Sequence, residues 1–293
     1  MPKLSLLTVL LTSFIFITTA CKNEPAENDK SKEPITKESI NLDWNNASIY
    51  FLLTDRFNNG DSTNDLNLSR TKETAKLRGF MGGDIKGITQ KINEGYFTNL
   101  GIDAFWVSPI FELIHGSVDE VSGVTYPFHG YWTKDWSALD PNFGTMEDLR
   151  EMIQAAHDKE IRILLDVIIN HTGPVTDIDP VWPESWVRTS PQCTYQGYET
   201  TANCTLVKNL PDVLTDSDEE VDLPPQLIEK WKAEGRYETE MKELDEFFAS
   251  TGLPRSPRYY IMKWLVDIIN DFGIDGFRVD TVKHLHEDVF AEL

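Results

Sequence analysis

Basic side chains are scarce in this sequence of 293 residues, in which 27 lysines and arginines face 48 aspartates and glutamates. The formal net charge is −21. Such a charge argues against nucleic acid and anionic membrane surfaces as partners, because both repel it, and it suits a neutral substrate or a bound cation. We therefore expect no nucleic-acid partner, and membrane attachment only through a separate anchor.

The N-terminal apolar run, Leu4 to Ile17, is short for a membrane span of about 20 residues. Lys3 precedes it, and small residues lead up to Cys21. This pattern predicts a signal peptide over 1–21 in preference to a transmembrane anchor. The residues before Cys21 resemble a bacterial lipobox, so we expect a lipid on Cys21, in preference to plain secretion, and a location in the cell envelope.

Large apolar residues are almost absent from 22–46, which predicts a flexible linker, because such a segment cannot bury enough surface to fold. Beyond Cys21 the chain has two cysteines, Cys193 and Cys204. In the oxidising compartment expected for an exported protein they should form a disulfide. Two small buried thiols are the alternative.

From residue 47 onward, apolar strands alternate with helices. Gly101 to Ser108 and Gly273 to Asp280 repeat one pattern, in which a glycine ends a helix and a short strand follows with polar residues at its exit. This repeat predicts a (β/α)8 TIM barrel with its site at the carboxyl ends of the strands. A doubly wound sheet is the alternative, but no glycine-rich phosphate loop follows the first strand. The expected strands are 48–53, 101–109, 161–169 and 276–280, and the expected helices are 84–100, 145–159 and 256–273.

Two segments interrupt the barrel pattern. Residues 111–143 are expected to form a long functional loop. Residues 172–255, rich in proline, threonine and aspartate, are expected to form a subdomain inserted after the third strand, with a helical part between Gln226 and Ser250. The barrel domain would then cover 47–293.

The stretch from Phe272 to His284 carries the strongest chemical signal. Arg278 and Asp280 are two residues apart on a strand, so they point to the same side. A guanidinium keeps a neighbouring carboxylate ionised. An ionised carboxylate at the carboxyl end of a barrel strand is what a glycosidase needs as a nucleophile. A purely structural ion pair is the alternative.

A second cluster of oxygen-bearing side chains lies in the turn 58–65, NNGDSTND, which Gly82, Gly83 and Asp84 follow. Hard cations take six to eight oxygen ligands, so the turn is a candidate cation site. An ordinary Asn/Asp/Gly turn explains the spacing at least as well.

Three motifs in order resemble signature regions of the α-amylase family, glycoside hydrolase family 13. They are DVIINH at 166–171, LPDV at 210–213 and GFRVDTVKH at 276–284. The exported, periplasmic branch is the most similar, through the HGYW loop at 129–132. The resemblance implies a retaining α-glucan hydrolase that acts on starch or maltodextrins, that is, an α-1,4-glucan or maltooligosaccharide.

The resemblance also implies roles for individual residues. Asp280 would be the nucleophile and Arg278 its charge partner. The residues implied in sugar binding or in orienting the site are Tyr131, His129, His171, Asp166, Lys283 and His284. Calcium is the implied cofactor, with one site formed by Asn170, Asp212 and the His284 carbonyl. A second site would comprise Asn59, Asp61, Asn64, Asp65, the Gly82 carbonyl and Asp84.

The family's acid/base glutamate and a second sugar-binding aspartate are expected on later strands, beyond Leu293, while Glu112 lies in the wrong loop for this role. The sequence is therefore expected to hold the first four β/α units, the N-terminal half of the barrel, and to be inactive by itself. Two alternatives stay open. One is a glucanotransferase on the same scaffold, and the other is a catalytically incomplete surface lipoprotein that only binds glycan.

Overall fold

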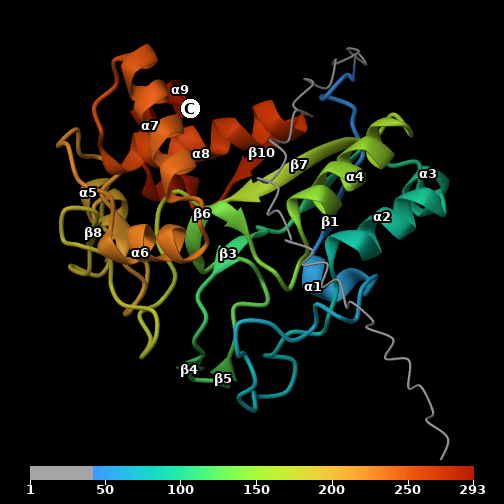
Figure 1. Cartoon of the computed structure of the whole chain (residues 1–293), viewed down its shortest axis with the longest axis horizontal. Helices are drawn as coiled ribbons and strands as arrows, with labels where there is room; N and C mark the ends of the chain where they lie inside the picture. Colours follow the sequence, from blue (N-terminus) through green and yellow to red (C-terminus); the bar gives the residue numbers. More distant parts are fainter. Residues whose placement is uncertain (1–41) are drawn as a thin grey trace, which may run out of the picture. The chain divides into compact units, whose positions relative to one another are not determined.

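The computed structural model describes residues 42–293 (Figure 1). The expected signal peptide, Cys21 and linker residues 22–41 lie outside the described residues. The central sheet has four parallel strands, neighbours in the order of the chain. They are β1 (Ile49–Leu52), β2 (Ala104–Val107), β7 (Arg162–Val167) and β10 (Gly276–Val279).

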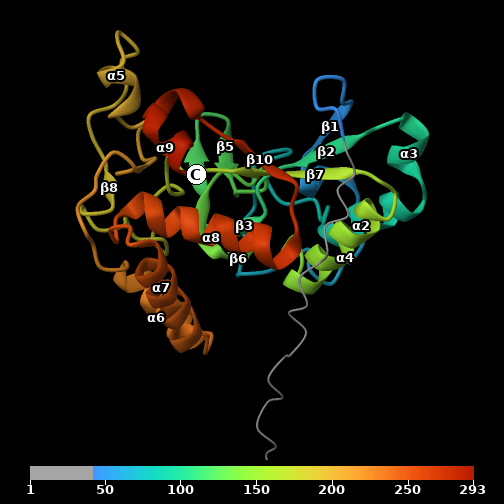
Figure 2. The same cartoon turned by 90° about the horizontal axis from the view of Figure 1, so that it is seen from above.

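Three helices cover one side of this sheet: α2 (Ile85–Asn93), α4 (Met146–His157) and α8 (Pro257–Phe272) (Figure 2). Helix α4 contacts both α2 and α8. A doubly wound sheet reverses its strand order and carries helices on both faces. The arrangement of the described elements is instead that of consecutive units of a β/α barrel.

Local sequence signals explain the ends of these helices. Thr145 and Asp148 form a capping box at the start of α4, with each side chain bonded to the backbone of the other. Helix α8 begins with Pro257 and ends at Gly273, which adopts the left-handed conformation with φ 76°. Both boundaries agree with the sequence-based prediction.

The helix expected over 84–100 is wrong in one respect, because the structure divides it. Helix α2 stops at Asn93, and α3 (Tyr96–Leu100) begins after Gly95, whose φ is 79°. A left-handed residue cannot continue a right-handed helix, and glycine adopts that conformation at little cost. Gly235, with φ 74°, likewise separates α6 (Pro225–Ala233) from α7 (Tyr237–Thr251), where one helical part was expected.

The segment 111–143 is more ordered than a loop. Strand β3 (Phe111–Leu113) pairs with β6 (Thr133–Leu139), and β4 (Val118–Glu120) pairs with β5 (Gly123–Thr125), both antiparallel. Three of these strands have three residues each. Strands that short show too little alternation to be recognised from sequence.

The segment after β7 contains the two-residue strands β8 (Val187–Arg188) and β9 (Asp212–Val213), the short helix α5 (Glu199–Ala202), and then α6 and α7. Cys193 and Cys204 form a disulfide in this segment. The remaining elements are α1 (Thr54–Phe57), η1 (Val282–His284) and α9 (Glu287–Glu292).

Candidate active site

Arg278 on β10 and Asp166 on β7 face each other in register. Arg278 Nη1 lies 3.1 Å from both oxygens of Asp166 and 2.5 Å from Asp280 Oδ1. One guanidinium therefore joins the carboxylates at the carboxyl ends of two neighbouring strands. The Asp280 side chain keeps 19% of its surface exposed, whereas Asp166 is fully buried. Of the two carboxylates, Asp280 is the one that a substrate can reach.

Asp166 is the hub of this cluster. Its Oδ2 accepts hydrogen bonds from the Tyr131 hydroxyl at 2.9 Å and from Trp106 Nε1 at 3.1 Å. Burial raises the pKa of Asp166 to about 6, although the hydrogen bond and charge of Arg278 act in the opposite direction. Burial also raises the pKa of Tyr131, and the Asp166 charge adds to this, so the phenol stays protonated and donates.

Trp106 is a site residue that the sequence analysis missed. Besides its bond to Asp166, its ring centroid lies 4.7 Å from the Arg278 guanidinium carbon, a cation–π contact. A signal for it was present in the repeat, which aligns Trp106 with Arg278 and Asp103 with Asp275. The two aspartates confirm the alignment, because each accepts a backbone N–H at the start of the neighbouring strand, from Ser48 and Ile163.

Two histidines contact Tyr131: His129 from the same loop before β6, and His171 from the segment that follows β7. His129 stacks on the Tyr131 ring at 5.7 Å, and its Nδ1 accepts the Tyr131 backbone N–H at 3.0 Å. His171 Nε2 lies 3.2 Å from the Tyr131 carbonyl oxygen, while its buried Nδ1 has no hydrogen-bond partner among residues 42–293. Burial lowers the pKa of each histidine to about 4, so both rings are neutral at pH 7.

Lys283 and His284 follow Asp280 in η1 and differ in exposure. His284 is buried, and its Nδ1 lies 2.7 Å from the Thr201 carbonyl oxygen. Lys283 is exposed, with Nζ 5.2 Å from the centre of the Tyr195 ring. The two residues were expected on the same side of the site, but their environments differ. Lys283 is open to a ligand, whereas the His284 ring contacts Thr201 of α5.

The segments that carry Asn170 and Asp212 meet directly. Val213 donates its backbone N–H to the Asn170 carbonyl at 2.7 Å, and Asn170 Nδ2 donates to Asp212 Oδ1 at 2.9 Å. Asn170 Oδ1 is buried without a partner. Burial raises the pKa of Asp212 to about 8, even though Arg188 Nε lies 3.0 Å from its Oδ2.

The turn 58–65 folds back onto Asp84, the N-cap of α2. Asp84 accepts the backbone N–H groups of Gly60, Asp61 and Gly87 at 2.6–3.0 Å. Asp61 pairs with Lys86 at 2.7 Å, and Asn59 Nδ2 donates to Asp65 Oδ1 at 2.8 Å.

Two features of this turn would leave room for a cation. Among the described residues, Asn64 Oδ1 is buried without a hydrogen-bond partner. A Cβ at Gly82 would come within 2.4 Å of Asn59 and 2.5 Å of Asp65, so this glycine keeps the space at the two side chains open. Within residues 42–293, however, no group of three or more His, Cys, Asp or Glu side chains is gathered as metal ligands. In this arrangement a cation would be held mainly by amide and backbone oxygens, with at most two carboxylates.

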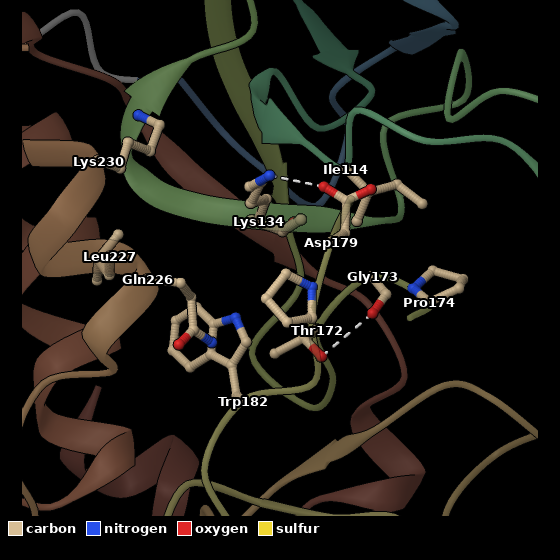
Figure 3. A pocket seen from close by; sticks show the side chains of 12 residues that line it. Ile114, Lys134, Thr172, Gly173, Pro174, Asp179, Trp182, Gln226, Leu227 and Lys230 are labelled. Atoms are coloured by element: carbon tan, nitrogen blue, oxygen red, sulfur yellow. Dashed lines mark hydrogen bonds and ion pairs between the residues drawn. The ribbon is translucent and has the colours of Figure 1, made fainter. Parts of the chain in front are cut away.

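Two other features lie apart from Asp280. Glu112 is committed to a buried network, with Oε2 2.7 Å from Lys230 and Oε1 2.9 Å from His115. A cavity of about 30 Å³ lies next to this network, between the Lys134–Asp179 ion pair and α6 (Figure 3). None of the expected catalytic or sugar-binding residues lines it.

A comparison of the sequence with family models identifies the family of this chain. The model described as the α-amylase catalytic domain matches residues 51–292. The chain belongs to the α-amylase family.

Relatives in the α-amylase family include both hydrolases and transferases. The periplasmic α-amylase of Escherichia coli is 33% identical over 88% of this chain and 44% of its own length. A cyclomaltodextrin glucanotransferase of Niallia circulans is 30% identical over 97% of this chain and 37% of its own length. The chain thus spans less than half the length of these curated relatives.

Solved structures agree with the fold. An α-amylase from Geobacillus thermoleovorans, determined as a complex with acarbose, matches with a TM-score of 0.58 and 25% identity. The match covers 85% of this chain and 43% of that one. The four described parallel strands thus correspond to part of an α-amylase barrel. In the part of the chain that the structure describes, no helix is long and apolar enough to cross a membrane.

Proposed function

We propose that this chain carries the nucleophile of a retaining α-glucan hydrolase and that Asp280 is that nucleophile. The observation that carries the proposal is the bridge that Arg278 forms between Asp280 and the buried Asp166. The guanidinium orients the Asp280 carboxylate through this charge-assisted hydrogen bond. Membership of the α-amylase family and partial exposure of Asp280 support the same role.

The reaction proceeds in two steps. Asp280 attacks the anomeric carbon of an α-1,4-linked glucose unit and forms a glycosyl-enzyme, while the glycosidic oxygen leaves with a proton from a carboxylic acid. Water then attacks the same carbon, gives its proton to that acid's conjugate base and releases Asp280. Glu112 does not serve as the acid, because Lys230 and His115 hold it. The acid is expected on a later barrel strand.

Tyr131 presents an aromatic ring beside Asp280 and is held by Asp166 and His129. We propose that it stacks on the sugar unit under attack. His171, neutral and with an unpartnered ring nitrogen, would hydrogen-bond that unit. Lys283 would donate to hydroxyls on the other side of Asp280, and His284, whose ring contacts the Thr201 carbonyl of α5, would support Lys283 from within η1.

We further propose structural calcium. The orphaned Asn170 oxygen and the buried Asp212 carboxylate fit a hard cation, with the His284 carbonyl as a third ligand. The ion would link Asn170, at the carboxyl end of barrel strand β7, to Asp212 in the inserted segment. A second ion at the turn 58–65 would use the Asn64 oxygen, Asn59, Asp65 and the Gly82 carbonyl. Asp61 would first have to release Lys86, and Asp84 the backbone N–H of Gly87, before either could bind this ion.

Transfer of the glycosyl group to a sugar hydroxyl is a second candidate, favoured by relatives named as cyclomaltodextrin glucanotransferases. Both reactions need Asp280, so the first test is the same. The full-length protein, meaning this sequence extended through further barrel strands, is incubated with maltoheptaose, and the products are separated by chromatography. Asp280→Asn should abolish turnover, whereas Asp288→Asn, the same charge change at an exposed position of α9, should not. Equal turnover by the two variants would contradict the proposal. Products longer than maltoheptaose indicate transfer.

Export with lipid attachment at Cys21 completes the proposal, supported by the N-terminal pattern and by the relative named as periplasmic. Cys21→Ser should release the protein from the membrane fraction. A variant that stays bound to the membrane would show that the anchor is something else.

A further inference from the structure

The disulfide-closed loop 193–204 carries two exposed tyrosines to the edge of the candidate site. Tyr195 is 53% exposed and Tyr198 is 51% exposed. Aromatic side chains of this size are usually buried, so a pair of exposed rings on one short loop needs an explanation. We propose that Tyr195 is a stacking platform for a glucose unit of the bound glucan, beyond Asp280 on the η1 side. The proposal rests on the proposed function and extends it to the inserted segment.

The loop is fastened to η1, the element that directly follows Asp280. His284 Nδ1 lies 2.7 Å from the Thr201 carbonyl oxygen, and His286 Nε2 lies 2.7 Å from Asn203 Oδ1. Tyr198 adds a hydrogen bond of 3.0 Å from its hydroxyl to His286 Nδ1. These contacts place the loop beside the residues that follow the nucleophile.

Tyr195 itself meets η1 through its ring. The His284 ring lies edge-on to it at 5.7 Å, and Lys283 Nζ lies 5.2 Å from its centre. The ammonium group lies over one face of the ring and can donate to sugar hydroxyls, while half of Tyr195 stays open to solvent. An apolar ring face beside a hydrogen-bond donor suits the C–H face and hydroxyl rim of a pyranose.

The backbone holds Tyr195 in one position. Its φ is 58°, a left-handed conformation that side-chain-bearing residues rarely adopt. The N–H groups of Thr194 and Tyr195 both donate to the Thr200 carbonyl at 3.2 Å, and the Cys193–Cys204 disulfide closes the loop around them. A preorganised ring binds a sugar with less loss of conformational freedom than a mobile one.

Tyr131 and Tyr195 approach Asp280 through different neighbours. Tyr131 is bonded to Asp166 on β7, whereas Tyr195 contacts His284 in η1. A glucan that stacks on both rings would reach from the Asp166 side of the site to η1. Tyr195 would then be a specificity residue for chain length, not a catalytic residue.

Nitration by tetranitromethane tests the platform directly on the full-length protein. Maltohexaose at ten times its Kd should slow nitration of Tyr195 roughly tenfold, as occupancy requires. Tyr96 on α3, 37% exposed, is the internal control and should react at the same rate with and without the sugar. Cellohexaose, with β-linkages, should protect neither tyrosine.

Binding of maltohexaose to matched variants is the second measurement. Tyr195→Ala should weaken binding roughly 3- to 10-fold, the contribution of one aromatic contact, whereas Tyr195→Phe should keep it. Val207→Ala, an exposed apolar change just outside the loop, should have no effect. Cys193→Ser with Cys204→Ser should weaken binding as Tyr195→Ala does, and the effects should not add, since both remove the same platform.

The outcomes separate this proposal from the function on which it rests. Hydrolysis that depends on Asp280, together with Tyr195 nitration unchanged by maltohexaose, would overturn the platform alone. Protection of Tyr195 without Asp280-dependent turnover would support the platform and overturn the proposed reaction. Absence of both effects would overturn both.

Discussion

Arg278 and Asp166, partners in register across β10 and β7, are joined by two hydrogen bonds of 3.1 Å from one guanidinium nitrogen to both carboxylate oxygens. The same nitrogen bonds Asp280. Arg278 acts to lower the pKa of Asp166. Because Asp166 is fully buried, the effect of burial outweighs that of the guanidinium and raises this pKa to about 6. Two predictions follow from this balance, one for each partner.

The first prediction concerns pH. Between about pH 4 and pH 6, folded Asp166 holds a proton that the unfolded chain has released, so the folded state gains stability as pH falls through this window. A shift of about two units corresponds to roughly 3 kcal/mol. Asp166→Asn removes this gain. The free energy of unfolding is measured with urea for the unsubstituted protein and for Asp166→Asn. The difference between the two should grow in favour of the unsubstituted protein as pH is lowered from 7 to 4.5. A difference that stays constant over this range would contradict the assignment.

The second prediction concerns geometry. Arg278→Lys keeps the positive charge but replaces the planar guanidinium with a single ammonium, which cannot hold two carboxylates in the same way. Turnover should fall about 10- to 100-fold, because a hydrogen bond to a charged group contributes about 1.5–3 kcal/mol. Arg78→Lys, at a half-exposed arginine paired with Glu120, is the control and should keep full activity. Unreduced turnover in Arg278→Lys would mean that charge alone suffices.

The sequence predicted this part of the site because its signals are local. Arg278 and Asp280 share a strand face by simple alternation, and the glycines at 101 and 273 mark where strands begin. The repeat aligns Trp106 with Arg278 and so marks its position, but its hydrogen bond to Asp166 depends on the register of β2 against β7. That register leaves little trace in one sequence.

The inserted segment was harder to predict for the same reason. Its contacts with η1 run between side chains and carbonyls about 83 residues apart, such as His284 and Thr201. Nothing local in the pattern around Tyr195 indicates that this ring lies beside Lys283. The division of 84–100 at Gly95 was, in contrast, readable from the glycine itself.

The third prediction concerns calcium. Asn170 and Asp212 come from segments 42 residues apart, and an ion between them would stabilise the folded state by mass action, by about 2.7 kcal/mol at a hundred times its Kd. Chelation with EGTA should lower the melting temperature of the full-length protein, and added calcium should restore it. In Asp212→Asn the melting temperature should start lower and respond less to EGTA. An unchanged melting temperature, with no calcium found by elemental analysis, would count against both proposed ions.

The last prediction concerns the 293-residue sequence tested by itself. Ile49 and Phe51 alternate with Tyr50 on β1, so they share one face of the sheet, and they are 49% and 46% exposed. Exposed apolar side chains of this kind bind hydrophobic dyes and promote association. We therefore expect dye binding and self-association. We also expect no glucan hydrolysis, because the general acid is expected on a later strand and contributes about 10²–10⁴-fold in rate.

A protein extended through further barrel strands should lose the dye binding and gain hydrolysis that Asp280→Asn abolishes without unfolding it. The two properties should change together, since the same strands would cover Phe51 and bring the acid to Asp280. Turnover by the 293-residue protein, abolished by Asp280→Asn, would instead place the acid within this sequence. Glu112 could supply it only by leaving Lys230, so Glu112→Gln would then be the decisive variant.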